Sequence, residues 1–424
     1  MVLTLMSIMI ALLLIGFPMM MSLIAAPLVV LNQYFPNMDP MMVTQQLYAG
    51  VSPFVLLAVP MFIFAADIMA AGQTANRLVD FVGNFVGHIR GGYAITTAAT
   101  CTLFGAISGS AQATVVAVGK PMRSKLLNIG YQDKAVMALI VNAADVALLI
   151  PPSIGMIMYC VVTGTSVGEL FIAGIFPGLV VFLFFSVYSY FYARAKNIPK
   201  QPKVTWGERW NGVKKALLPL GFPVIIIGGI YSGQFSPTEA AAISVLYAII
   251  LEMFIFKSVK AKDLHGIALS TGLVTAAVFI LVAGGSAFSW VISYAEIPEL
   301  ITSGVLGPDP SALTVLIMVT LFFFIGCMFV DQIVVIMVLT PIFFPVAMQA
   351  GIDPIVLGII ITLQAAIGAS TPPFGCDIFT ACAVFNRPYM EVIKGTPPFI
   401  IMLVAVSLLA IAFPEAILVY RYFM

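Results

Sequence analysis

Apolar stretches of about 20 residues recur along the whole chain, and each is long enough to cross a lipid bilayer as a helix. Hydrophobic residues make up 61% of the 424 residues and charged residues 9%, whereas a soluble domain has about 25% charged residues. A transmembrane barrel would show short alternating segments instead, and the sequence has none. The chain is therefore predicted to be an all-α polytopic membrane protein.

The apolar pattern predicts membrane spans on both sides of one basic connector. The expected spans are 1–31, 50–72, 131–164, 168–193, 216–233, 237–256, 268–293, 350–385 and 395–420. The N-terminal stretch lacks a basic n-region, so it is interpreted as the first span and not as a signal peptide. The connector 194–215 carries seven basic residues and one acid, which predicts a cytoplasmic location. Threading outward from it places the N-terminus in the cytoplasm, together with every Lys and Arg except Arg421.

Two further apolar stretches, 92–119 and 311–346, must enter and leave the membrane on the same side to satisfy this threading. Each is therefore predicted to be a re-entrant hairpin. Its two arms are expected to hold about 14 residues each, which is too short for a single crossing.

Glycines and prolines of the two halves match at a constant offset of 221 residues. The matches are Gly83 with Gly304, Gly105 with Gly326, Pro151 and Pro152 with Pro372 and Pro373, Gly174 with Gly395, and Pro177 with Pro398. The extra span 216–233 makes the second copy enter from the opposite face, which predicts an inverted-topology repeat of the kind found in secondary transporters. Repeat 1 then occupies 1–193, and the extra span and repeat 2 occupy 216–424.

The Pro pairs interrupt the spans 131–164 and 350–385 near their middles, because proline lacks the N–H that a helix interior needs. Non-helical backbone at membrane depth is tolerated where it lines a cavity. The freed carbonyls suit a cation such as Na⁺, and the N-terminus of the following half-helix suits an anion. One such break can therefore bind a coupling ion and an anionic substrate side by side.

The hairpin tips are expected to close over these breaks and complete two Na⁺ sites. The first site would use Ser108, Ser110, Ala147, Ile150 and Pro152, and the second Phe329, Asp331, Gly368, Thr371 and Pro373, mostly through backbone carbonyls. An intramembrane carboxylate such as Asp331 is functional by default. Because Ser153 follows the first Pro pair and Phe374 the second, we expect the first break to share in holding substrate, and the second to be mainly a cation site with an apolar lid.

Simpler interpretations stay open at each of these positions. "GAISG" is also a small-residue pattern for helix packing, a Pro pair can be only a kink, and Asp331 can be only a cap of the tip. Asp67 lies near the cytoplasmic end of its span and can be solvated. Asp377 can bind substrate or cap its half-helix. Asp145 has Ala366 as its repeat mate, and no two of these aspartates form an evident pair.

Five stretches resemble the large membrane (M) subunit of tripartite ATP-independent periplasmic (TRAP) transporters. They are "FGAISGSAQAT", "LLIPPSIG", "GGIYSGQFSPTEAAA", "TPIFFPVAMQAGIDPI" and "GASTPPFGCDIF". The first break, "NAADVALLIPPS", departs from the pattern of many members, which have Gly and Thr before the Pro pair; Ala147 stands where Gly is common.

The resemblance implies Na⁺-coupled uptake of an organic acid across the bacterial inner membrane, without ATP. It implies a periplasmic binding protein and a small membrane (Q) subunit, expected here as a separate chain. It implies an elevator in which 76–190 and 296–420, less their outer spans, move against a scaffold. It also implies substrate contacts at Ser110, Ser153 and Asp331. "TPPFGCDIFTACAVF" is reminiscent of sialic-acid members, with C4-dicarboxylates and other sugar acids as alternatives.

A channel is the second alternative, because paired re-entrant hairpins also build pores. An intramembrane enzyme is disfavoured, because the sequence lacks a constellation such as HExxH or a Ser–His pair at the expected site. We expect no nucleic-acid partner.

Overall fold

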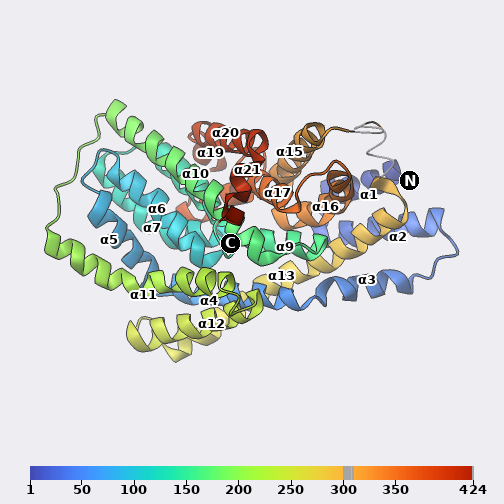
Figure 1. Ribbon diagram of the computed structural model, residues 1–424, viewed down its shortest axis with the longest axis horizontal. Coiled ribbons are helices and arrows are strands. Elements are labelled where there is room, and N and C mark those ends of the chain that lie inside the picture. The colour runs from blue at the N-terminus through green and yellow to red at the C-terminus, as the bar shows by residue number, and fades with distance from the viewer. Residues whose placement is uncertain (299–306, 308–309, 423–424) are drawn as a thin grey trace.

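The computed structural model describes residues 1–298, 307 and 310–422, and within these ranges all regular secondary structure is helical. Figure 1 shows the helices in two groups. The first, called here the outer layer, contains α3 (Met41–Val51), α4 (Ala58–Ala71), α5 (Thr74–Val86), α11 (Trp206–Tyr231), α12 (Pro237–Ile249) and α13 (Ala261–Tyr294). The second, called the hairpin bundle, contains α6 (Gly92–Ser108), α7 (Ala111–Ile129), α8 (Asp133–Asp145), α9 (Ile154–Thr163), α10 (Val167–Ala195), α15 (Ala312–Phe329), α16 (Gln332–Gln349), α17 (Pro354–Ala369), α18 (Cys376–Phe385) and α20 (Pro397–Ala412).

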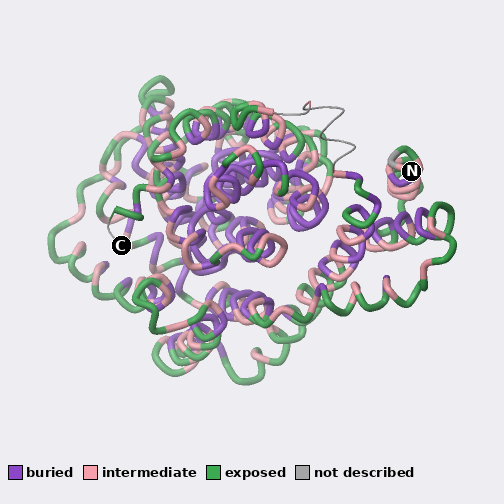
Figure 2. The backbone as a smooth tube through the Cα atoms, turned by 45° about the vertical axis from the view of Figure 1, so that its right-hand side comes forward, coloured by how far each residue is buried: buried purple, intermediate pink, exposed green. Residues whose placement is uncertain are grey.

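Among the described residues, seven helices are long and apolar enough to cross a bilayer as single spans. This confirms the prediction of an all-helical polytopic membrane protein. Buried residues gather in the hairpin bundle, whereas exposed residues follow the outer helices, where lipid or partner chains would lie (Figure 2).

The prediction of one N-terminal span over 1–31 is wrong. The chain forms two shorter helices, α1 (Val2–Ile15) and α2 (Met19–Tyr34), which pack against each other. Gly16 ends α1 in the left-handed conformation, with φ 92°. Pro18 then precedes α2 as its N-cap residue. The helix therefore ends and restarts between Gly16 and Pro18, although the hydropathy of the stretch stays high.

The structure differs from expectation in other segments too. The predicted span 395–420 is bent by 100° between α20 and the segment Pro414–Tyr422. The basic connector is shorter than 194–215, because a capping box between Thr205 and Glu208 begins α11 at Trp206. The helices α3 and α5 were not expected, since each mixes apolar with polar residues.

The hairpin arms are longer than the expected 14 residues. The arms α6 and α7 hold 17 and 19 residues, and α15 and α16 hold 18 each. The prediction fails because the helices continue into polar sequence, as α7 does past Lys120 and Arg123. Arm length therefore does not forbid a single crossing.

Both predicted helix breaks are present. A 3₁₀ turn over Val146–Leu148 follows α8, and α9 begins only at Ile154; in the second half, 370–375 separates α17 from α18. The peptide bond between the two prolines is cis in both breaks. The longest helix, among those described, is α13, with 34 residues, and it packs against α3 and α4 as well as against α16 of the hairpin bundle.

Candidate functional site

The first hairpin tip lies directly on the first helix break. Gly109 joins α6 to α7 with φ 61°, and a Cβ atom at this position would collide with the carbonyl oxygen of Pro152. One turn earlier, Gly105 packs against Ala147 in the same way. The tip therefore needs glycine twice, once for its left-handed turn and once for close approach.

The second tip lies on the second break. Val330 and Asp331 join α15 to α16, and the carbonyl oxygen of Met328 accepts hydrogen bonds from the backbone N–H groups of Phe374 at 3.2 Å and Gly375 at 3.3 Å. Gly368 packs against Cys327. The structure thus brings each predicted tip to the break in its own half of the chain.

A cavity of about 360 Å³ lies between the two tips and the outer layer. Its polar lining residues are Asp67, Ser108, Ser110, Gln112, Asp331 and Gln332. Its apolar walls include Ile63 of α4 and Val274 and Val278 of α13. None of the described lining residues is Lys, Arg or His, so the charged side chains of the cavity are carboxylates alone.

Two of the three predicted substrate contacts line this cavity, and each begins a helix. Ser110 is the N-cap of α7, where its Oγ accepts a hydrogen bond from the N–H of Ala113 at 3.4 Å and donates to Oε1 of Gln112 at 3.0 Å. Asp331 is the N-cap of α16, where its Oδ1 accepts from the N–H of Ile333 at 2.9 Å. Asp331 therefore caps the tip and faces the cavity at once.

The third predicted contact, Ser153, lies elsewhere. Its side chain is 0% exposed and caps α9, where Oγ accepts from the N–H of Met156 at 3.4 Å. The neighbouring Ile154 lines the cavity instead. Phe374 of the second break is half-exposed and packs on Phe379, with the two ring centroids 4.7 Å apart.

The breaks offer backbone oxygens that suit a hard monovalent cation. The carbonyl oxygens of Ala369 and Thr371 converge beside Gly375, each 3.0 Å from where a Cβ atom would stand. The Cδ1 atom of Ile378 lies nearer to that position, at 2.7 Å, so a Cβ atom would crowd the methyl group and both oxygens. Backbone carbonyl oxygens of this kind are the donors that fit Na⁺. Of the other predicted ligands, Pro373 already accepts a hydrogen bond from the hydroxyl of Tyr389 at 2.7 Å. The described residues hold no cluster of three or more His, Cys, Asp or Glu arranged for a metal.

At the first break the oxygens are partly engaged within the tip. The hydroxyl of Ser108 is 3.1 Å from the carbonyl oxygen of Ser110 and 3.0 Å from the hydroxyl of Thr114. The carbonyl of Pro152 faces the tip at Gly109. The tip and the break thus present hydroxyl and carbonyl oxygens to each other.

Asp67, for which the sequence left solvation open, lines the cavity. Its Oδ2 accepts a hydrogen bond from the hydroxyl of Thr271 on α13 at 2.6 Å, and its side chain is partly buried in the cavity wall. The signal that could have identified it is the carboxylate itself within the apolar helix α4.

A pair of buried carboxyl groups also went unrecognised. Asp145, at the end of α8, and Asp377, in the first turn of α18, are both 0% exposed, and each carboxyl group lies within electrostatic reach of the other. Among the described residues, neither oxygen of Asp145 has a hydrogen-bond partner. Asp145 precedes the first break and Asp377 follows the second, a proximity that the sequence did not make evident. Because the residues are 232 positions apart and not related by the offset of 221, the repeat could not reveal the proximity.

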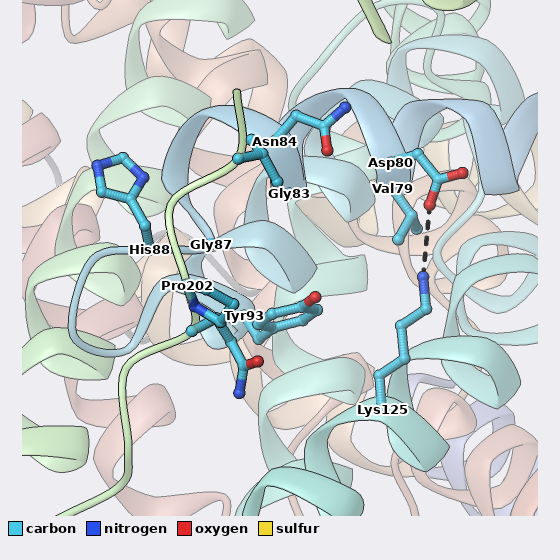
Figure 3. Close-up of a pocket in the computed structure, with 11 residues that line it drawn as sticks. Val79, Asp80, Gly83, Asn84, Gly87, His88, Tyr93, Lys125 and Pro202 are labelled. Carbon is cyan, nitrogen blue, oxygen red and sulfur yellow. Dashed lines mark ion pairs between the residues drawn. The ribbon is translucent and has the colours of Figure 1, made fainter. Parts of the chain in front are cut away.

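A second pocket, of about 80 Å³, lies between α5, the hairpin bundle and the connector (Figure 3). Its charged wall is an exposed ion pair in which Nζ of Lys125 is 3.5 Å from Oδ1 of Asp80. It contains none of the predicted site residues, and its volume is less than a quarter of that of the cavity between the tips.

Known proteins resemble the chain over nearly all of its length. Residues 6–416 match the family described as the tripartite ATP-independent periplasmic transporter, DctM component. The ectoine TRAP transporter large permease protein TeaC of Halomonas elongata is 58% identical over 414 residues, which cover 97% of each chain. The ectoine/5-hydroxyectoine TRAP transporter large permease protein UehC of Ruegeria pomeroyi is 57% identical over 97% of each chain.

A solved structure shares the fold. The YdaH transporter of Alcanivorax borkumensis superposes with a TM-score of 0.63 at 14% identity, covering 88% of this chain and 87% of its own. The family match and the two relatives agree with the several apolar spans described above. The chain therefore belongs to the DctM family: it is a large permease component of a tripartite ATP-independent periplasmic transporter, a multi-pass inner-membrane protein and not an enzyme.

Proposed function

We propose that the chain carries ectoine, or a closely similar cyclic zwitterion, across the inner membrane by Na⁺-coupled transport. The observation that carries the proposal is the charge of the cavity: Asp67 and Asp331 line it, and no described basic residue does. The two relatives whose printed names include ectoine, at 58% and 57% identity, support the same substrate.

Ectoine is a six-membered cyclic amidinium that carries a ring carboxylate. A carboxylate of the cavity can pair with the amidinium, while the ligand's own carboxylate can lie at the start of α7, where Ser110 and free N–H groups favour an anion. A C4-dicarboxylate or a sialic acid brings only negative charge to a site with two carboxylates, which is unfavourable at low dielectric. Ectoine therefore replaces sialic acid as the preferred substrate.

We propose further that the two hairpins and broken helices form an inverted repeat that moves as an elevator against the outer layer. Equivalent contacts support the repeat: Gly105 packs against Ala147 in the first half, and Cys327 against Gly368 in the second, where 147 and 368 differ by the predicted 221. The match of Gly83 with Gly304 falls outside the described residues. The hairpins are proposed to be re-entrant, with the N-terminus in the cytoplasm.

We propose that Na⁺ is held at each break. Ser108, Ser110, Ala147, Ile150 and Pro152 would supply oxygens to the first site, and Phe329, Asp331, Gly368, Thr371 and Pro373 to the second, with Ala369 added by its position beside Gly375. When bound, the ion would offset the charge of the adjacent carboxylates, and its movement down the Na⁺ gradient would drive substrate uptake. The tips would exclude water by closing over the breaks.

The family implies a substrate-binding protein and a small membrane subunit as partners. We propose that the binding protein delivers the substrate from the periplasm and that the small subunit is a separate chain. The many exposed apolar residues along α11 and α13, such as Val224 at 68% and Leu273 at 67% exposed, leave surface for that subunit and for lipid.

The test is uptake of radiolabelled ectoine by proteoliposomes that contain the complete transporter. We expect uptake to require the binding protein and an inward Na⁺ gradient, and to stop when K⁺ or choline replaces Na⁺. Uptake of a dicarboxylate or a sialic acid in place of ectoine would refute the substrate, and uptake indifferent to Na⁺ would refute the coupling. Ion conductance without coupled uptake would favour a channel.

A further inference from the structure

Asp67 faces the substrate cavity from the opposite side to the predicted site. It belongs to α4 of the outer layer, whereas Ser110 and Asp331 belong to the tips of the hairpin bundle. Its neighbours in the wall are apolar, among them Ile63, Val274 and Val278. A carboxylate in such a wall is costly unless a cation or a hydrogen-bond donor compensates it.

We propose, on the basis of the proposed function, that Asp67 binds the cationic group of the substrate and selects for zwitterions over anions. The hydroxyl of Thr271 holds Oδ2 at 2.6 Å and so orients the carboxylate. Among the described residues Thr271 is the one donor to Asp67, and no basic side chain lines the cavity, which leaves Oδ1 available to a ligand N–H. Thr271 is accordingly a positioning residue.

Gln332 places a polar residue beside the same cavity. Its side chain is 7% exposed, and its Oε1 is buried near Gly155 of α9 without a hydrogen-bond partner among the described residues. The charged acceptors of the cavity are therefore the carboxylates of Asp67 and Asp331. An amidinium carries two parallel N–H groups with a delocalised positive charge, so it matches such a carboxylate.

The position of Asp67 on the outer layer makes this contact dependent on conformation. If the hairpin bundle moves against the outer layer, Asp67 stays behind, and its bond to the ligand exists only while the cavity is closed against α4. Asp67 therefore contributes to affinity in one state of the transport cycle, while Asp331 accompanies the ligand.

The experiment compares Asp67→Asn with the unaltered protein in the purified complex of permease and small subunit. Asn keeps the acceptor for Thr271 and removes the charge. We expect the Kd for ectoine, measured by calorimetry, to rise by about tenfold or more. The cationic fragment acetamidinium should compete with ectoine for the unaltered protein and lose this ability in Asp67→Asn, whereas competition by acetate should be unchanged.

Matched variants on α13 separate ligand binding from structural damage. Thr271→Val removes the orienting hydroxyl and should weaken ectoine binding less than Asp67→Asn does. Thr275→Val makes the same change one turn along. Both threonines line a pocket between α4, α12 and α13 and neither lines the cavity, but the Thr275 hydroxyl has no hydrogen-bond partner among the described residues, so its loss should leave binding unchanged. Asp67→Glu should restore part of the affinity and the competition by acetamidinium.

Unchanged ectoine affinity in Asp67→Asn overturns the inference, as does a loss of maximal uptake rate without any change in Kd. If Asp67→Asn fails to fold, equal affinities in Thr271→Val and Thr275→Val overturn it instead. If the unaltered protein neither binds nor transports ectoine, the proposed function itself fails, so the two failures are distinguishable.

Discussion

The buried carboxylate of Glu252 accepts a hydrogen bond from the backbone N–H of Thr74 at 3.1 Å, across 178 residues of sequence. Its other oxygen accepts from the N–H of Gln73 at 3.0 Å. Glu252 lies in the π-helical turn Ile250–Ile255 that follows α12, and Thr74 begins α5. One side chain of the outer layer thereby caps the helix that leads into the hairpin bundle.

Replacing Glu252 by Ala should lower the free energy of unfolding by about 3 kcal/mol, because the buried N–H and hydroxyl of Thr74 and the partly buried N–H of Gln73 lose their acceptor. The measurement is the thermal unfolding midpoint of the purified protein in detergent. Glu208→Ala provides the control, since Glu208 accepts from the N–H of Thr205 at 2.8 Å in the same way but at an exposed helix start, where water can replace it. Equal midpoints for the two variants would contradict the role of Glu252.

Replacing Asp331 by Asn should abolish or strongly reduce ectoine uptake while the protein stays folded, because it removes a charge from the cavity and keeps the cap on α16. Asp353→Asn is the matched control: Asp353 caps α17, where Oδ1 accepts from the N–H of Ile355 at 2.8 Å, and it lies outside the cavity. Normal uptake in Asp331→Asn would remove Asp331 from the site.

Replacing Gly109 by Ala should reduce uptake by about tenfold or more, since the tip would be pushed away from the Pro152 carbonyl. Gly164→Ala carries the same left-handed strain, with φ 72° against 61°, but a Cβ atom there meets nothing within 4 Å. Initial uptake rates of the two variants separate backbone strain from loss of tip closure. Similar uptake rates in both variants would show that the close contact between the first hairpin tip and the first break is not needed for transport.

Replacing Gly375 by Ala should weaken the apparent affinity for Na⁺ more than that for ectoine, because the methyl group would collide with Cδ1 of Ile378 and crowd the carbonyls of Ala369 and Thr371. Gly351→Ala is the control, with φ 75° and open space around the added methyl group. The measurement is ectoine uptake at a series of Na⁺ concentrations. A change confined to ectoine affinity would place the cation elsewhere.

Repeat periodicity and proline chemistry predicted the parts of the site that depend on local sequence. Both breaks follow from the Pro pairs, because proline dictates where a helix must stop. The tips followed from the threading of the spans, and the substrate contacts at Ser110 and Asp331, which line one cavity, followed from the family resemblance. The predicted span 237–256 begins where α12 begins, at Pro237, and there Ser236 and Glu239 form a capping box.

Contacts across the bundle could not be predicted in the same way. Asp145 and Asp377 lie in different halves and outside the repeat offset, and Asp67 reaches the cavity only through the packing of α4 against the tips. Hydropathy also misplaced the first span, because it averages over the turn at Gly16. Such features depend on tertiary packing, which no local pattern encodes.

The length of α13 has a geometric consequence for any motion of the hairpin bundle. Its 34 residues extend for about 51 Å at 1.5 Å per residue, against a hydrocarbon core of about 30 Å. A helix this long cannot stand upright within the apolar slab, so it slopes or projects beyond it. α16 packs along α13. If α13 slopes through the membrane, α16 would change its depth in the membrane whenever it slides along α13.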